Sequence, residues 1–315
     1  MVAALARIDA AHRDIIHDVQ MNEYGNRLAT CSADRMVKIF DVKPNNQSYP
    51  MAELSGHEGP VWKVAWAPLA EDFLLASCSY DKKVIIWKET NLKWQKMFEY
   101  SQHEASVNSV DWAPRQHGLI LVCGSTDGRV SIIEQVNDEW KGNCIDNAHE
   151  DGVNSVSFAP YGINGFSTDE MTAKVICKKF VSCGNDKKVN IWSFNNGSGK
   201  WELEHTLEGH DDFVRDVAWA PFGVNGIATI ASCGQDNKII LWTCNYGNNE
   251  KKWKKQILDT LDEYATSLSF NTVGDVLCVS AGDSTIKLYK HVVDEWIELK
   301  SPKKDYIKNS TKPKN

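Results

Sequence analysis

Three repeats of one residue set could, by residue type alone, form a hydrolytic site. Each set holds a histidine, a serine and an aspartate, the side chains that together activate a serine nucleophile. A tryptophan follows each aspartate by six residues. The sets are His57, Ser77, Asp81 and Trp87; His149, Ser182, Asp186 and Trp192; and His210, Ser232, Asp236 and Trp242. A hydrolase does not need three equivalent triads, so we expect no catalytic residue in the chain.

We interpret each set as a structural tetrad. In this tetrad the aspartate accepts a hydrogen bond from the histidine, the serine is the bridging residue of the hydrogen-bonded chain, and the tryptophan indole N–H has a hydrogen-bond acceptor. A buried polar group without a partner costs about 1–3 kcal/mol, so a complete network stabilises the loop, turn and strand that it joins.

Cysteines are the other candidate for chemistry. Four of them stand three residues before an aspartate: Cys31, Cys78, Cys183 and Cys233. They would bind a metal only if four separate repeats converged on one point, so we expect small buried core residues instead. Gly124–Gly128 is a turn rather than a nucleophile elbow, and no glycine-rich phosphate loop follows a strand. We therefore expect neither a metal nor a cofactor.

The elements that position these residues recur along the chain. Aspartates stand in turns between short apolar runs, 46 to 59 residues apart, at Asp34, Asp81, Asp127, Asp186, Asp236 and Asp283. This is the period of a propeller blade. Alternation predicts strands; in residues 61–66 we expect Val61, Lys63 and Ala65 to point one way and Trp62, Val64 and Trp66 the other.

A fourth, outer strand in each repeat is marked by a tryptophan: Trp94, Trp140, Trp201, Trp253 and Trp296. The sequence therefore predicts an all-β, WD-type β-propeller of six four-stranded blades over residues 1–300. The longest interval between turn aspartates predicts an insertion at residues 161–179 in the fourth repeat. Residues 301–315, with five lysines, are expected to form a disordered tail.

Composition narrows the classes of function. The net charge of −7 and the pI near 5.7 disfavour direct binding to nucleic acid or to an anionic membrane. Nine cysteines without a CxxC pair favour reduced thiols over a disulfide framework. The N-terminal residues have too short an apolar run for a signal peptide. We expect a protein of the cytosol or nucleus.

Several runs resemble one family closely. They include Gly56–Pro68 (GHEGPVWKVAWAP), Leu75–Glu89 (LASCSYDKKVIIWKE), Ser106–Pro114 (SVNSVDWAP) and Leu207–Pro221 (LEGHDDFVRDVAWAP). These are similar to the Sec-thirteen propeller family, from about Ile8 to Leu299. The resemblance implies a structural subunit of the outer cage of coat protein complex II (COPII), which serves protein transport from the endoplasmic reticulum to the Golgi. It also implies a place in the outer ring of the nuclear pore.

The resemblance further implies an open propeller that a rod-like partner completes in trans with a seventh blade. The sequence offers its own support, because the last repeat already has an outer strand at Glu295–Leu299 and a strand at Ala4–Ile8 would be surplus. We expect Ala4, Leu5, Ala6, Arg7 and Ile8 to contact the partner's blade; the segment could also simply fray. Membrane contact would be indirect, through the coat. The alternative is a self-closed WD adaptor for ubiquitin transfer or chromatin recognition.

Overall fold

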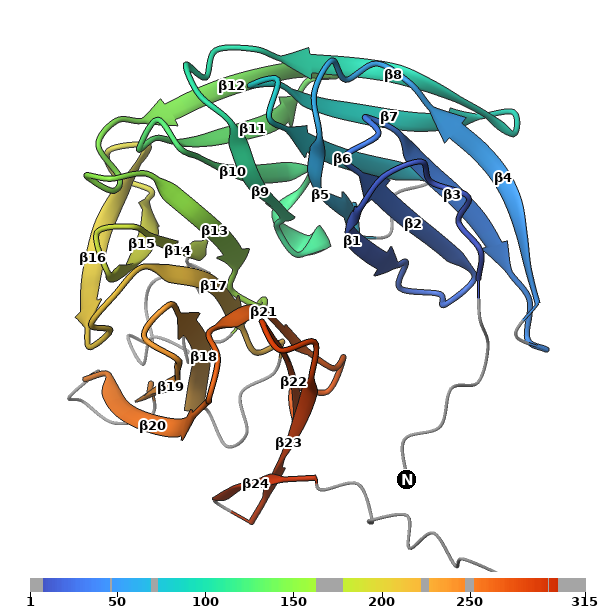
Figure 1. Cartoon of the computed structure of the whole chain (residues 1–315). Coiled ribbons are helices and arrows are strands. Elements are labelled where there is room, and N and C mark those ends of the chain that lie inside the picture. The colour runs from blue at the N-terminus through green and yellow to red at the C-terminus, as the bar shows by residue number, and fades with distance from the viewer. Residues whose placement is uncertain are drawn as a thin grey trace, which may run out of the picture.

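The computed structural model describes residues 8–45, 47–68, 73–162, 178–221, 227–246, 252–293 and 295–299. Its strands form six antiparallel sheets of four. Figure 1 shows these sheets as blades that follow one another in chain order around a centre. The first strand of each blade lies innermost. The prediction of six four-stranded blades is confirmed.

The blades are numbered in chain order. Blade one holds β1 (Ile16–Met21), β2 (Arg27–Ser32), β3 (Val37–Val42) and β4 (Ser48–Leu54). Blade two holds β5 (Val61–Trp66), β6 (Leu74–Ser79), β7 (Val84–Thr90) and β8 (Lys93–Tyr100). Blade three holds β9 (Val107–Trp112), β10 (Ile120–Ser125), β11 (Val130–Val136) and β12 (Glu139–Ile145), with a 3-10 turn at Arg115–His117.

Blade four holds β13 (Val153–Phe158), β14 (Lys179–Gly184), β15 (Lys188–Asn195) and β16 (Lys200–Glu208). Blade five holds β17 (Val214–Trp219), β18 (Ile227–Gly234), β19 (Lys238–Asn245) and β20 (Lys254–Thr260). Blade six holds β21 (Ala265–Phe270), β22 (Val276–Ala281), β23 (Ile286–Val292) and β24 (Glu295–Glu298).

The core lies between neighbouring blades. The second strands of blades one to five are largely buried, and β6 is buried along its whole length. Small residues such as Ala76 and Cys78 on one blade pack against larger ones such as Val107 and Trp112 on the next. Because the sheets of blades two to five are covered on both faces in this way, their second and third strands are largely buried and do not alternate between buried and exposed residues.

The innermost strands depart from the predicted alternation. A β-bulge between Val61 and Lys63 places Val61 with Val64, where both pack against blade one. Trp62 and Lys63 instead both line a central channel. The prediction that Val61 shares a face with Lys63 and Ala65 was therefore wrong, because one extra residue in a strand reverses the side chains beyond it. The same pairing irregularity recurs in the other five blades.

Side chains on these strands also join one blade to the next. Asp111 Oδ2 accepts the backbone N–H of Phe158 in blade four at 2.7 Å. Asp18 and Asp216 accept N–H groups of Val64 and Leu268 in the same manner. Each of these bonds satisfies a buried backbone donor that its own sheet leaves unpaired.

Three predicted segments lie wholly or partly outside the described residues: the insertion, the C-terminal tail and the N-terminal strand. Residues 163–177 of the expected insertion and residues 301–315 of the expected tail lie outside the described residues. Lys179, placed in the insertion by the sequence, already belongs to β14. Ala4, Leu5, Ala6 and Arg7 also lie outside the described residues.

We predict that Asp111→Ala lowers the free energy of unfolding by about 1–3 kcal/mol, because the N–H of Phe158 loses its acceptor. Asp111→Asn keeps an acceptor oxygen and should lose less. Urea unfolding measures both. Ala65 and Ala218 occupy the same strand position in blades two and five, so the backbone accepts alanine there. Equal stability of the alanine variant and wild type would show that this bond contributes nothing.

Candidate functional site

The three complete tetrads have one geometry. His57 Nδ1 lies 2.9 Å from an Asp81 carboxylate oxygen, and His57 Nε2 lies 2.8 Å from Ser77 Oγ. Trp87 Nε1 donates to the same Ser77 Oγ at 2.9 Å. The corresponding bonds in blades four and five, among His149, Ser182, Asp186 and Trp192 and among His210, Ser232, Asp236 and Trp242, are 2.8–3.1 Å long.

The network requires a neutral histidine. Ser77 Oγ accepts the indole N–H, so its hydroxyl hydrogen is free to donate to His57 Nε2. His57 Nδ1–H then donates to Asp81. A protonated ring would turn Nε2 into a second donor facing that hydroxyl, which would be left without an acceptor. One tautomer of one charge state therefore satisfies all four side chains.

The same geometry removes the nucleophilic alternative. Ser77, Ser182 and Ser232 are fully buried in the free chain. Each hydroxyl is already engaged by an indole and an imidazole. A serine nucleophile must reach a substrate carbonyl and be held by an oxyanion-stabilising site. The tetrads can tie a loop to a strand, but they cannot present a hydroxyl to a substrate.

Blades one and three keep part of the network, with another residue in the role of the tetrad serine. In blade one Thr30 replaces the serine and bonds His12, which contacts Asp34 at 2.8 Å. Phe40, which has no polar hydrogen, stands in the tryptophan position. In blade three Cys123 takes the serine position, and Ser131 on the neighbouring strand bonds His103 instead.

Blade six lacks the network. Leu261, Val279 and Tyr289 stand where other blades have histidine, serine and tryptophan. The Tyr289 hydroxyl donates to the partly exposed Asp259 carboxylate at 2.5 Å, and Lys287 donates to the same carboxylate. The last blade is therefore held by a more exposed and more salt-sensitive contact.

Protonation follows from burial and these bonds. Burial alone would raise the pKa of Asp81, but the hydrogen bonds from His57 and from the backbone of Glu58 and Lys83 outweigh it and hold the pKa below its usual value. Burial lowers the pKa of His103 and His210, and their aspartate partners offset this only in part.

We predict that Asp81→Ala and Asp236→Ala each lower the free energy of unfolding by about 1–3 kcal/mol, since each leaves a buried histidine donor unpaired. Thermal and urea unfolding would measure the loss. Asp283→Ala is the matched control, because blade six has no histidine at the tetrad position. If the first two variants unfold like wild type, the tetrads do not stabilise the fold.

The lowered histidine pKa values predict a pH dependence with a definite sign. As pH falls through 6.5, the unfolded chain protonates His103 and His210 while the folded chain does not. The stability advantage of wild type over the double variant H103Q/H210Q should therefore shrink from pH 7.5 to 5. Over this range, unfolding of wild type should take up at most about two more protons than unfolding of the variant. It should be flat from pH 7.5 to 8.5. An advantage that grows on acidification would contradict the neutral-histidine network.

The four cysteines singled out from the sequence lie apart, one on each of four blades. Cys31, Cys78, Cys183 and Cys233 are fully buried in separate interfaces between blades. Burial raises the pKa of all four thiols, so the thiolate form that binds metals or attacks electrophiles is disfavoured. In the part of the chain that the structure describes, no group of three or more histidine, cysteine, aspartate or glutamate side chains could hold a metal ion.

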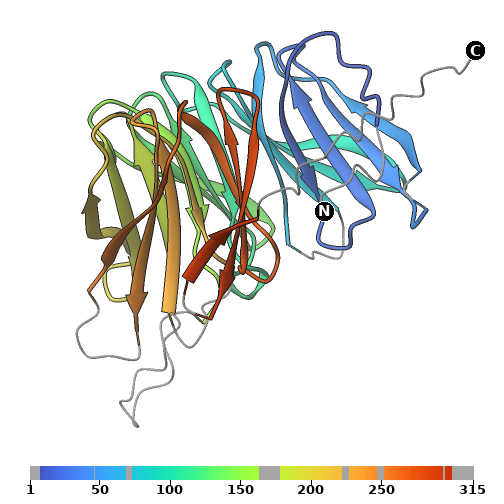
Figure 2. The ribbon, with the colours of Figure 1, turned by 60° about the horizontal axis from the view of Figure 1, so that its bottom comes forward.

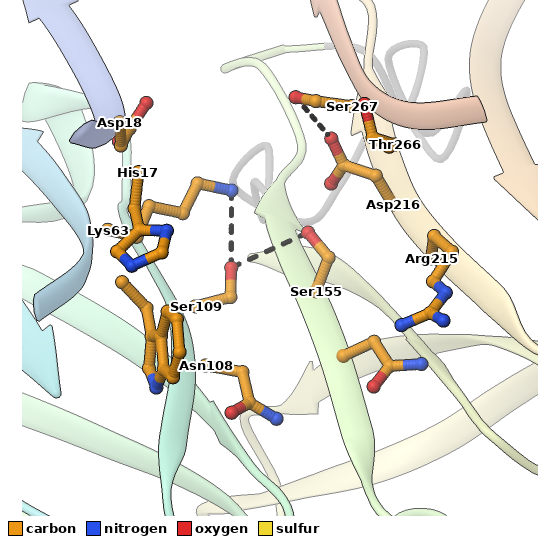
Figure 3. A pocket seen from close by; sticks show the side chains of 12 residues that line it. His17, Asp18, Lys63, Asn108, Ser109, Ser155, Arg215, Asp216, Thr266 and Ser267 are labelled. Atoms are coloured by element: carbon orange, nitrogen blue, oxygen red, sulfur yellow. Dashed lines mark hydrogen bonds between the residues drawn. The ribbon is translucent and has the colours of Figure 1, made fainter. Parts of the chain in front are cut away.

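A polar channel runs along the axis, lined by the two side chains that each bulge turns inward. Its narrow part encloses about 160 Å³. Figure 3 shows its wall, where Lys63 Nζ donates to Ser109 Oγ and Ser267 Oγ donates to Asp216. At its mouth the His17 and Trp62 rings lie 4.5 Å apart. This channel could not be predicted from the sequence, because a pattern of strict alternation does not show the bulge.

The most unusual feature is a gap between the first and last blades. β1 packs on β5, and each later innermost strand packs on the next, but β21 and β1 make no comparable contact among the described residues. Figures 1 and 2 show blade six (red) and blade one (blue) standing apart. Two sheet faces border this gap, and we call them the blade-one face and the blade-six face.

The blade-one face exposes apolar residues at positions that are buried elsewhere. Ile16 and Val19 are 41% and 52% exposed, whereas their counterparts in blades two to six are at most 7% exposed. Met21, Leu28 and Phe40 extend this face. Met21 is the only non-aromatic residue at its repeat position, a signal that could have marked the face in the sequence.

The blade-six face shows the same exposure. Ile286 is 70% exposed, while the five residues at its position in the other blades are fully buried: Val37, Val84, Val130, Val189 and Ile239. Leu288 and Cys278 beside it are partly exposed, and their counterparts are buried. The two faces that border the gap thus carry the apolar residues of an interface between blades, but no neighbouring blade covers them among the described residues.

Ile8 is the one residue of the predicted N-terminal contact segment that the structure describes. It is not in a strand. Its side chain packs with Ala10 against Leu28 and Phe40, on the blade-one face. The chain therefore enters the first blade along the border of the gap. In the described part of the chain, no helix is long and apolar enough to cross a bilayer.

Comparison with known proteins agrees with this architecture. The family of the WD domain, G-beta repeat, matches residues 5–41, 48–88, 94–134, 142–193 and 201–243, which fall on blades one to five. The Protein SEC13 homolog of Caenorhabditis briggsae is 46% identical over 307 residues, covering 97% of each chain. The Protein transport protein sec13 of Schizosaccharomyces pombe is 48% identical over 295 residues, covering 93% of this chain and 97% of that protein. This chain belongs to the SEC13 family of WD-repeat β-propeller proteins.

Proposed function

We propose that this chain is a non-catalytic scaffold subunit that acts in protein transport by accepting a blade from a rod-like partner. Its place would be the outer cage of the COPII coat, on the cytoplasmic face of the endoplasmic reticulum and on transport vesicles. The name of the Schizosaccharomyces pombe relative, Protein transport protein sec13, supports the process. The gap between blades one and six supports the mode of binding.

The exposure of Ile16 and Val19 is the observation that carries the proposal. Positions that are at most 7% exposed in five blades are 41% and 52% exposed in the first. Apolar surface leaves water favourably, by roughly 25 cal/mol per Å². A partner that covers both the blade-one face and the blade-six face would gain this free energy of burial from both of its own faces.

The partner must supply a sheet, because the gap exposes faces rather than unpaired strand edges. Each of the six blades already has four strands in this structure. A seventh sheet between the two faces would bury area in the obligate class, on the order of 2,000–5,000 Å². Ala4, Leu5, Ala6 and Arg7, which precede Ile8 in the sequence, would contribute to the same interface.

A self-closed adaptor is disfavoured by the same faces. Closure within one chain would require β21 to pack on β1 as the other innermost strands pack on their neighbours. Ile16 and Ile286 would then be covered. Their exposure favours closure in trans over closure within the chain.

We further propose that the same gap serves a rod subunit of the outer ring of the nuclear pore. One blade-accepting surface suits both assemblies, since both would need only a rod that carries a complementary sheet. Contact with membrane or nucleic acid would then be indirect. This is in keeping with the net charge of −7.

We predict that Val19→Asp and Ile286→Asp each reduce partner binding about tenfold or more, because each would bury an unpaired carboxylate in the interface. The free chain should keep its stability within about 0.5 kcal/mol, since both side chains are exposed there. Quantitative co-purification of the tagged full-length chain from cells, with mass-spectrometric identification of bound chains, is the measurement.

Leu92→Asp is the matched control. Leu92 is 78% exposed, on the turn between β7 and β8 and away from the gap. It should leave partner recovery unchanged. Recovery of the same long partner by all three variants would refute insertion of a blade at the gap.

A further inference from the structure

The gap also interrupts a ring of polar side chains inside the channel. The third residue of each innermost strand points inward, and we call these six side chains the inner ring: Asp18, Lys63, Ser109, Ser155, Asp216 and Ser267. Hydrogen bonds connect three pairs of neighbours in this ring: Lys63 with Ser109, Ser109 with Ser155, and Ser267 with Asp216. The ring is open between Ser267 of blade six and Asp18 of blade one. A seventh blade would place its own third residue in this slot.

The charges beside the slot are negative. Asp18 borders it directly, and Asp216 lies behind Ser267, to which it is bonded at 3.0 Å. The single cation of the inner ring, Lys63, lies on the other side of Asp18, and its ammonium group donates to Ser109, toward blade three. Arg215, at the channel mouth, is engaged by Gln235 at 2.7 Å. The slot itself has no cation among the described residues that face it.

Because Asp18 is largely buried, the excess of negative charge beside the slot affects its ionisation. Burial raises the pKa of Asp18, against the attraction of Lys63 and two backbone hydrogen bonds, and repulsion from Asp216 adds to the rise. The two carboxylates therefore act on each other across the channel. A seventh blade would exclude more water from Asp18, and a carboxylate that is only partly compensated becomes more costly as water leaves.

Resting on the blade insertion proposed above, we propose that the partner's blade carries a lysine or arginine at the slot, and that this cation selects the partner. Blade two shows that the chain's own geometry accepts such a side chain, since Lys63 occupies this strand position next to Asp18. An acidic residue there would face Asp18 and Asp216 in a narrow channel. An apolar residue would exclude water from Asp18 and add no positive charge beyond that of Lys63.

The test uses a partner blade of known sequence. A second copy of blade two, residues 57–102, is appended to the full chain, with residues 300–315 as the linker. The copy brings Lys63 to the slot. The unmodified fusion is compared with fusions carrying Lys63→Met or Lys63→Arg in the appended copy only. Each fusion is made with Asp18 intact and with Asp18→Asn.

Hydrogen exchange of residues 16–21 reports whether the appended blade covers the blade-one face, and urea unfolding reports its strength. We expect the equilibrium constant for unfolding to be about tenfold smaller for the fusion with the lysine copy than for the fusion with the methionine copy. The arginine copy should match lysine. With Asp18→Asn the difference should vanish, whereas the control Asp151→Asn, on an exposed loop of blade four, should preserve it.

The outcomes separate the two proposals. If the amides of residues 16–21 gain no protection in any fusion, the gap does not accept a blade and both proposals fail. If all copies protect these amides equally and lysine brings no advantage, blade insertion stands and the cation rule is wrong. A lysine advantage that survives Asp18→Asn would also overturn the rule, because the advantage would then not depend on that carboxylate.

Discussion

Every sheet in this molecule has two apolar faces, and its architecture depends on covering both. A blade cannot do this alone, because its second and third strands carry apolar side chains on both faces, as β6 and β7 show. The bulge in the innermost strand makes the arrangement regular. It turns two consecutive side chains toward the axis and returns the next one to the neighbouring blade. Core, channel and exposed faces all follow from this one constraint.

The tetrads serve the same constraint at the rim of the blades. Their burial requires that every polar atom be paired, and a serine that both accepts and donates makes this possible. Blade three shows how tolerant the solution is, since Ser131 replaces a serine from a different strand and reaches the same histidine. Blades one to five thus share a histidine that is bonded at both ring nitrogens, although the residue that bonds Nε2 differs.

Much of this could be predicted from the sequence. Turn aspartates and their histidines gave the number of blades and the members of each tetrad, because those residues recur at fixed spacing. The channel could not be predicted, since a one-residue bulge leaves no mark in a pattern of alternating residues. The gap was expected from the family resemblance, and the only support from the residues themselves was a surplus strand expected at Ala4–Ile8. Whether Ile16 and Val19 are covered depends on distant blades, and local sequence does not encode it.

The missing contact between β21 and β1 changes how the molecule resists unfolding. In a closed ring each blade has two neighbours, but here the chain of blades has two ends. Stability then accumulates from neighbour to neighbour, as in a linear repeat array whose end units fray first. Blade six, with Asp259 and Tyr289 in place of a tetrad, is the weaker end. A seventh sheet would therefore give every blade two neighbours. The end blades would no longer unfold before the others, and unfolding would become equally cooperative for all blades.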